Sequence, residues 1–172
     1  MLAQGISDFF KTDANQAQES VESYPVKAMV IDDNDFDRRI IRRCLNEHPN
    51  IIHVHDSANG FQALEYIMIH KMRPDLIFLD VAMPVINGPE VMASLRRELE
   101  GGSSRVVMMS SLKEADFEQS GVLYGADSFL SKEYAISKMT AALHSYVDAI
   151  VNGEGWPDLR RADSSLDYGP AQ

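Results

Sequence analysis

The decapeptide VKAMVIDDND, residues 26–35, contains the transition on which the interpretation of this chain depends. An apolar run, 26–31, leads directly into three carboxylates within four residues, Asp32, Asp33 and Asp35. Two ionised carboxylates about 4 Å apart repel by roughly 4 kcal/mol at the effective dielectric near a protein surface. A bound divalent cation, a shared proton or enough intervening water would each offset this repulsion.

The composition is that of a soluble globular chain with one domain and tails: 172 residues, of which 45% are apolar. A net charge of −10 and a pI near 4.8 argue against nucleic acid or anionic membranes as partners, because both would be repelled. No apolar run approaches the length of a membrane span, and the N-terminus lacks the pattern of a secretory signal. A single cysteine, Cys44, leaves no internal disulfide. We therefore expect a cytoplasmic protein.

Short apolar runs alternate along the chain with longer amphipathic segments. The expected strands are 26–31, 51–55, 76–79, 106–109 and 128–130. The expected helices are 35–47, 60–71, 89–99, 114–124 and 135–151. This alternation predicts an open doubly wound α/β domain, in which a five-stranded parallel sheet is covered on both faces by five helices. The expected strand order is 2-1-3-4-5, which is that of a flavodoxin-like fold.

Two of the expected helices have an apolar face at helical spacing. In the first helix this face comprises Phe36, Ile40, Ile41 and Cys44. In the last helix it comprises Ile136, Met139, Leu143, Val147 and Ile150. We expect both faces to be part of the core.

Acidic residues stand at the ends of two expected strands. Asp32 and Asp33 follow the first strand, and Asp80 ends the third. If the strand order is 2-1-3-4-5, these strands are neighbours and the three carboxylates converge at the edge where such sheets bind ligands. Ser110 closes the fourth strand beside them, and Lys132 follows the fifth.

With these residues in place, the chain resembles the receiver domain of two-component response regulators, typified by the single-domain chemotaxis regulator. The resemblance covers about residues 26–150. Its motif consists of the pair Asp32-Asp33, the segment DVAMP from Asp80 to Pro84 with Gly88 four residues later, then Ser110, Phe129 and Lys132. Each of these residues alone would be a weak signal, but their combination and order are specific.

The resemblance implies a role for each site residue. Asp80 would accept a phosphoryl group from a phosphohistidine on a sensor histidine kinase or a histidine phosphotransfer protein. Asp33, Asp80 and the backbone carbonyl of Ala82 would hold Mg²⁺, with Asp32 bound through water. Lys132 would bind a phosphoryl oxygen and would pair with Asp80 in the ground state. These cations fit the chemistry, because a carboxylate can attack a phosphoryl group only when the negative charge on both is neutralised.

The resemblance also implies a switch. The Ser110 hydroxyl would reach the new phosphoryl oxygens by moving its loop inward, and Phe129 would then turn to a more buried rotamer. This change would remodel the surface formed by the fourth helix, fifth strand and fifth helix, which is the expected docking surface for a downstream protein. Ordinary packing for Phe129 and strand-end capping for Ser110 are the structural alternatives.

The chain departs from the family pattern at three positions. Glu133 stands where many receivers have a proline after the lysine, so we expect a trans peptide bond there. Ala82 and Leu112 flank the expected route of hydrolytic water, and neither side chain can orient a water molecule. We therefore expect slow autodephosphorylation and no other enzyme activity.

We expect three parts in the chain: an N-terminal extension (1–24), the receiver domain (25–152) and a C-terminal tail (153–172). The tail is rich in Gly, Pro, Ser and Asp and is expected to be flexible. A tail of this length is too short to form an output domain. The expected function is that of a stand-alone response regulator that signals through protein binding, with homodimerisation left open. Relay of phosphate in a multi-step phosphorelay, and a phosphorylation-independent scaffold, are the alternatives within the family.

Two other protein classes share parts of the pattern. A flavodoxin-like electron carrier would hold a flavin phosphate in the loop after the first strand, where Asp32, Asp33 and Asp35 would repel it. A phosphatase of the haloacid dehalogenase kind would need a second acid two residues after the nucleophile, where this chain has Ala82. The receiver interpretation is therefore preferred.

Overall fold

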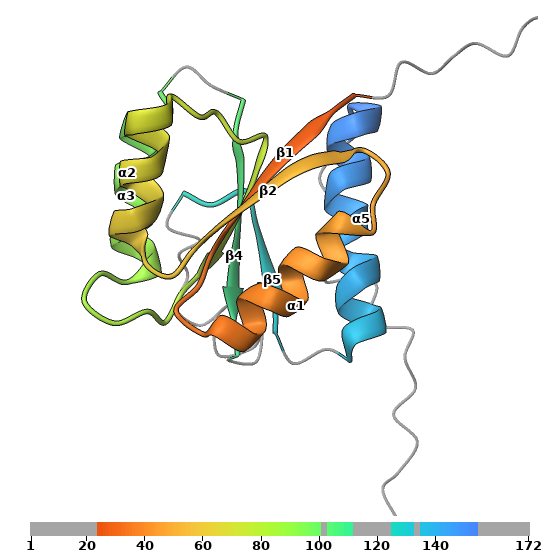
Figure 1. Cartoon of the computed structure of the whole chain (residues 1–172), viewed down its shortest axis with the longest axis horizontal. Helices are drawn as coiled ribbons and strands as arrows, with labels where there is room; N and C mark the ends of the chain where they lie inside the picture. The colour runs from red at the N-terminus through yellow and green to blue at the C-terminus, as the bar shows by residue number, and fades with distance from the viewer. Residues whose placement is uncertain (1–23, 101–102, 112–124, 133–134, 155–172) are drawn as a thin grey trace, which may run out of the picture.

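The computed structural model describes residues 24–100, 103–111, 125–132 and 135–154. Within them, parallel strands form one five-stranded sheet in the order β2-β1-β3-β4-β5 (Figure 1). The strands are β1 (Val26–Ile31), β2 (Ile51–Ser57), β3 (Leu76–Asp80), β4 (Arg105–Ser110) and β5 (Ser128–Ser131). The predicted fold class and strand order are confirmed, with strands that run up to two residues beyond the expected bounds.

The sheet is covered on both faces. The helices are α1 (Asp35–Asn46), α2 (Gly60–His70), α3 (Gly88–Glu98) and α5 (Ile136–Asn152). Figure 1 shows α2 and α3 on one side of the sheet and α1 and α5 on the other. The helix expected over 114–124 lies outside the described residues. Within the described ranges, no helix has the length and apolar character needed to cross a bilayer.

The side chains of β1 alternate between two apolar layers, as the pleat of a strand requires. Ala28 and Val30 belong to the layer that includes α1 and α5, whereas Met29 and Ile31 belong to the layer that includes α2 and α3. In the central strand β3, every residue is buried. This burial on both faces explains why β3 reads as a continuous apolar run that ends in Asp80.

Two residues expected in the core are exposed. Phe36 in the first turn of α1 is 69% exposed, and Ile136 in the first turn of α5 is 60% exposed. Helical spacing gives the direction of a side chain but not its depth, and these first turns lie at the edge of the packed layer. The remaining positions of both stripes are buried or half-buried.

An asparagine begins each helix that follows β1, β2 and β3. The side chains of Asn34, Asn59 and Asn87 accept hydrogen bonds from backbone N–H groups in the first turns of α1, α2 and α3. For α3 the cap is reciprocal, since Glu90 accepts a hydrogen bond from the backbone of Asn87. These caps fix where the chain leaves each strand end, and thus the loops that carry the acidic residues.

The loop between β3 and α3 folds back closely on the strand end. The backbone N–H of Gly88 donates to the Val81 carbonyl at 3.1 Å. A Cβ at Gly88 would lie 2.4 Å from the Asp80 carbonyl oxygen, which no side chain can tolerate. Val85 in the same loop has a φ of 70° and is 93% exposed. A β-branched residue is strained in this left-handed region.

Relief of this strain should stabilise the domain. We expect Val85→Asn to increase the free energy of unfolding by about 1 kcal/mol, because asparagine adopts the left-handed conformation at low cost and little apolar burial is lost. Urea denaturation measures the change. Val85→Ala is the matched control, since alanine keeps a Cβ at the strained φ, and it should give less than half the gain. Equal stability of Val85→Asn and the wild type would contradict this interpretation.

Candidate functional site

The three acidic residues predicted to converge do lie together. Asp32 directly follows β1, and Asp80 is the last residue of the neighbouring strand β3. One carboxylate oxygen from each of Asp32, Asp33 and Asp80 lies within 4.8 Å of the other two. Asp32 and Asp80 are buried, whereas Asp33 is exposed.

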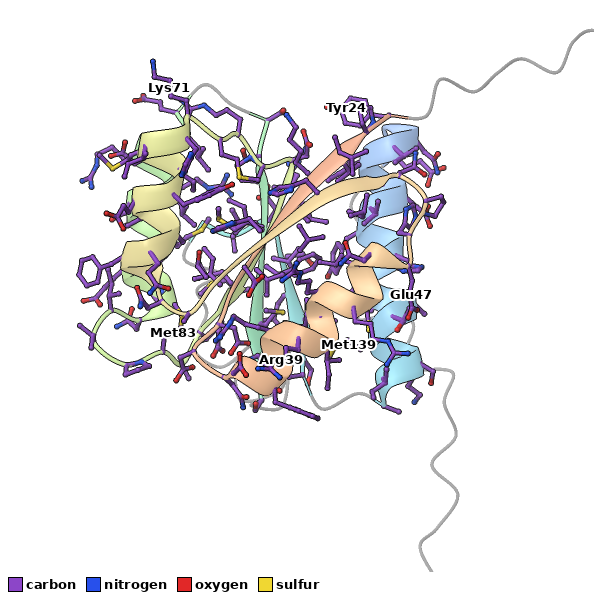
Figure 2. The ribbon with its side chains drawn as sticks, viewed as in Figure 1. Tyr24, Arg39, Glu47, Lys71, Met83 and Met139 are labelled. Atoms are coloured by element: carbon purple, nitrogen blue, oxygen red, sulfur yellow. The ribbon has the colours of Figure 1, made fainter. Side chains whose placement is uncertain are left out.

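The cluster occupies the edge of the sheet where the strands end. Figure 2 shows Met83, from the loop after β3, and Arg39, from α1, at this edge, and shows Tyr24 and Lys71 at the opposite edge. The arrangement agrees with the parallel topology, in which all the strand ends and the loops after them share one side of the domain.

Lys132 is the cation of the site. Its Nζ lies 2.6 Å from Asp32 Oδ2, 3.1 Å from Asp80 Oδ2 and 3.4 Å from Asp37 Oδ2. Its side chain is only 8% exposed. Lys132 follows β5 directly, and its backbone N–H donates to the Ser110 carbonyl at 2.8 Å, so the β4–β5 ladder sets its position.

The charges in this cluster shift one another's pKa values. Burial raises the pKa of the Asp32 carboxyl, the contact with Lys132 opposes that rise, and the nearby Asp80 carboxylate adds to it. Burial alone would lower the pKa of Lys132, but the pairing with Asp32 and Asp80 outweighs burial, so its pKa is raised. The charged form of Lys132 is therefore favoured by the cluster, whereas the charged form of Asp32 is disfavoured.

Backbone groups hold both buried carboxylates in place. The N–H of Asn34 donates to Asp32 Oδ1 at 2.8 Å, and the N–H of Ala82 donates to Asp80 Oδ1 at 3.3 Å. The Oδ2 atom of each residue is thereby left facing Lys132. Lys132 and Asp32 form the shorter of the two ion pairs that result.

Three residues at the site were missed by the sequence interpretation. Asn34 caps α1 while its N–H binds Asp32. Arg38 donates to the Asp32 carbonyl at 2.7 Å, and Asp37 shares Lys132 with the other acids. The asparagine just before a helical pattern was a readable capping signal. The contacts of Arg38 and Asp37 depend on how α1 packs and had no such signal.

The other predicted site residues lie along β4, β5 and the loop after β3. Ser110 is buried at the end of β4, and Phe129 is half-buried in β5, where it pairs with Met108. Ala82 is exposed two residues after Asp80. Leu112 and Glu133 lie outside the described residues. The roles expected of these residues stay predictions.

The donor set suits a hard divalent cation. Mg²⁺ prefers oxygen ligands and is commonly held by one or two carboxylates together with water. Here an exposed carboxylate, Asp33, lies beside two buried ones. Asp32, Asp33 and Asp80 therefore form an acidic cluster that fits a metal ion.

Comparison with known proteins decides the family. The model of the response regulator receiver domain matches residues 28–144. The chain belongs to this family. A receiver accounts for the acidic pair after β1, the aspartate at the end of β3 and the lysine after β5 in one constellation, as the sequence motif predicted.

Similar proteins include receivers from several signalling systems. A protein-glutamate methylesterase/protein-glutamine glutaminase of Alkalilimnicola ehrlichii is 34% identical over 77% of this chain and 34% of its own length. The Vibrio cholerae chemotaxis protein CheY4 is 25% identical with a TM-score of 0.59, covering 70% of this chain and 97% of that structure. The phosphorylated cyanobacterial phytochrome response regulator RcpA shares the fold, with a TM-score of 0.65 at 22% identity, covering 78% and 99%. The receiver spans about a third of the length of the methylesterase relatives it matches.

The raised pKa of Asp32 leads to a prediction on pH and stability. A raised pKa in the folded state means that the protonated carboxyl contributes stability below the unfolded value of 3.8, and that this contribution is lost as the pH rises through the folded pKa. Asp32→Asn resembles the protonated form at every pH. In EDTA we expect this variant to melt at a higher temperature than the wild type at pH 7, with the difference shrinking toward pH 4.

Asp33→Asn is the control, because this exposed carboxyl should change the melting temperature little in EDTA. Thermal denaturation followed by circular dichroism between pH 4 and pH 8 gives the comparison. A lower melting temperature for Asp32→Asn than for the wild type at pH 7 would show that the ion pair with Lys132 outweighs the burial of Asp32.

Proposed function

We propose that this receiver is the phosphoacceptor domain of a response regulator that takes a phosphoryl group onto Asp80 and signals by a phosphorylation-dependent change in protein binding. A sensor histidine kinase or a histidine phosphotransfer protein is the donor. The observation that supports the proposal best is the position of Asp80: its carboxylate ends a buried strand, 3.1 Å from Lys132 and within the acidic cluster.

The residues around Asp80 fit phosphoryl transfer. An Asp80 oxygen attacks phosphorus, the bond from phosphorus to the donor imidazole breaks, and the imidazole nitrogen takes the electron pair. Lys132 offsets the charge of Asp80 before transfer and that of the phosphoryl oxygens afterwards. Mg²⁺ bound to Asp33, Asp80 and the Ala82 carbonyl, with Asp32 bound through water, would neutralise further charge on the phosphoryl group.

The switch predicted from the resemblance is part of this proposal. Ser110 ends β4 and lies in the same ladder as Lys132, through the Lys132–Ser110 backbone hydrogen bond. Phe129 lies in β5, three residues before Lys132. A hydroxyl and an aromatic side chain thus occur on the two strands that end at the phosphoacceptor site. We propose that they convey its state to the surface around β5 and α5, where the downstream protein binds.

The boundaries of the functional unit are proposed as 25–152, flanked by an N-terminal extension and a C-terminal tail. We propose a stand-alone regulator whose output is protein binding in the cytoplasm, with a phosphorelay step as the alternative. Methylesterase activity is named only for relatives about three times as long as the matched receiver. An Asp80→Asn variant that retained all binding of the downstream protein would favour the scaffold alternative.

Binding of Mg²⁺ should stabilise the domain. At a concentration ten times its dissociation constant, the ion should add about 1.4 kcal/mol to the free energy of unfolding, because it binds only the folded cluster. Asp33→Asn should abolish most of this gain. Glu65→Gln removes a charge from an exposed site on α2 and should keep the gain. Thermal denaturation with and without Mg²⁺ gives the measurement, and a wild-type melting temperature that does not respond to the ion would exclude the metal site.

Phosphorylation can be tested with acetyl phosphate as a small-molecule donor. With Mg²⁺ present, intact-protein mass spectrometry should show a single added phosphoryl group that is absent in Asp80→Asn. Lys132→Met should reduce the labelling rate at least tenfold, because the charge on Asp80 is then left unpaired. Loss of the label should take many minutes, as Ala82 cannot orient water. Labelling that persists in Asp80→Asn would overturn the assignment of the phosphoacceptor.

A further inference from the structure

A buried tyrosine joins α5 to the strand that carries the site lysine. Tyr146 on α5 is fully buried. Its hydroxyl lies 2.8 Å from Ser128 Oγ and donates to the Phe129 carbonyl at 3.3 Å. Since a phenol has one proton, the Ser128 hydroxyl is the donor to Tyr146 when that proton is directed at Phe129. Both acceptor and donor belong to β5.

The position of β5 gives this contact its importance. β5 is an edge strand of four residues, and among the strands of the described residues it pairs with β4 alone. Backbone groups on the outer edge of such a strand face away from the neighbouring strand. A hydroxyl from α5 that reaches the Phe129 carbonyl therefore fixes the helix to the edge of the sheet. The Tyr146 ring packs against Phe78 of β3, with centroids 6.0 Å apart, which holds the hydroxyl in place.

The same strand leads directly to the phosphoacceptor. Lys132 follows Ser131, the last residue of β5, and its Nζ lies 3.1 Å from Asp80 Oδ2. A short continuous path thus runs from Asp80 through Lys132 along β5 to Tyr146 and α5. A new contact between Lys132 and a phosphoryl group on Asp80 would shift Lys132. It would thereby shift β5, the strand to which Tyr146 is hydrogen-bonded.

We propose that Tyr146 is a positioning residue whose hydroxyl transmits the phosphorylation state of Asp80 from β5 to α5. The proposal rests on the function proposed above and specifies how the α5 surface responds to it. The contacts of Tyr146 with Ser128, Phe129 and Phe78 all involve residues outside the acidic cluster. Removal of the Tyr146 hydroxyl should therefore weaken the response of α5 and leave the chemistry at Asp80 intact.

The test compares wild type, Tyr146→Phe and a matched control in the full chain. Tyr146→Phe keeps the ring that packs on Phe78 and removes only the hydroxyl. Tyr66→Phe removes the hydroxyl of a tyrosine on α2, whose ring stacks on His55 at 3.5 Å on the other side of the sheet. Amide chemical shifts are recorded by NMR before and after addition of beryllofluoride and Mg²⁺, which imitate the phosphorylated state.

In wild type and in Tyr66→Phe we expect shift changes in the loops around Asp80, in β5 and along α5. In Tyr146→Phe the changes around Asp80 and the labelling rate with acetyl phosphate should stay within twofold of wild type, while the mean change over α5 falls by at least half. A purely structural role would instead reduce the changes in all regions together. Full α5 changes in Tyr146→Phe, or a uniform reduction, would overturn the proposal.

Two further outcomes are covered by the same design. Should Tyr146→Phe fail to fold, Ser128→Ala removes one of the two hydrogen bonds that the Tyr146 hydroxyl makes with β5, and is held to the same criteria. If the wild type shows no shift changes with beryllofluoride in any region, the proposed function and this inference are both overturned. A wild type that responds fully, together with a Tyr146→Phe variant that also responds fully, overturns the inference alone.

Discussion

The repulsion among three carboxylates at one edge of the sheet is the constraint on which the rest of the site depends. The parallel pairing of β1 and β3 places Asp32 and Asp80 close together despite the repulsion between their carboxylates, and Asp33 lies beside them. Lys132 offsets part of this repulsion, because its ammonium group lies within 3.1 Å of both buried carboxylates. A single ammonium group cannot balance three carboxylates. The residual negative charge is what makes the cluster suited to a metal ion, and to a phosphoryl group only once a cation is present.

Several features of the fold hold the site residues in this arrangement. Asparagine caps fix the chain where it leaves β1, β2 and β3, and Gly88 lets the next loop lie against the Asp80 carbonyl. The hydrogen bond from Lys132 to Ser110 makes the position of the lysine a property of the β4–β5 ladder. Through that ladder the charge at Asp80 is connected to β5, and through Tyr146 to α5. The site and the helix that responds to it are thus parts of one packed unit.

The alternation of apolar and amphipathic segments predicted the strands, because strand period is a local property of the sequence. The convergence of the acids followed once the expected strand order was assumed, because parallel neighbours end at the same edge of a sheet. The sequence did not predict that Phe36 and Ile136 are exposed, since periodicity specifies a direction and not the extent of the neighbouring layer. It missed the contacts of Arg38 and Tyr146 because they depend on how α1 and α5 pack against the sheet, which no local sequence pattern specifies. The left-handed conformation of Val85 was also unpredictable, as the local preference of valine opposes it and the closed loop imposes it.

The central claim is that Lys132 is held by Asp32 and Asp80 as the charged centre of the site, and the titration of Lys132 itself tests it most directly. Selective ¹³C labelling of lysine allows the Cε resonance of Lys132, assigned with Lys132→Arg, to be followed with pH by NMR. The account predicts a pKa above the ordinary value of 10.5, because pairing with the two acids outweighs burial. A pKa below 10.5 would mean that burial dominates, and would contradict the account.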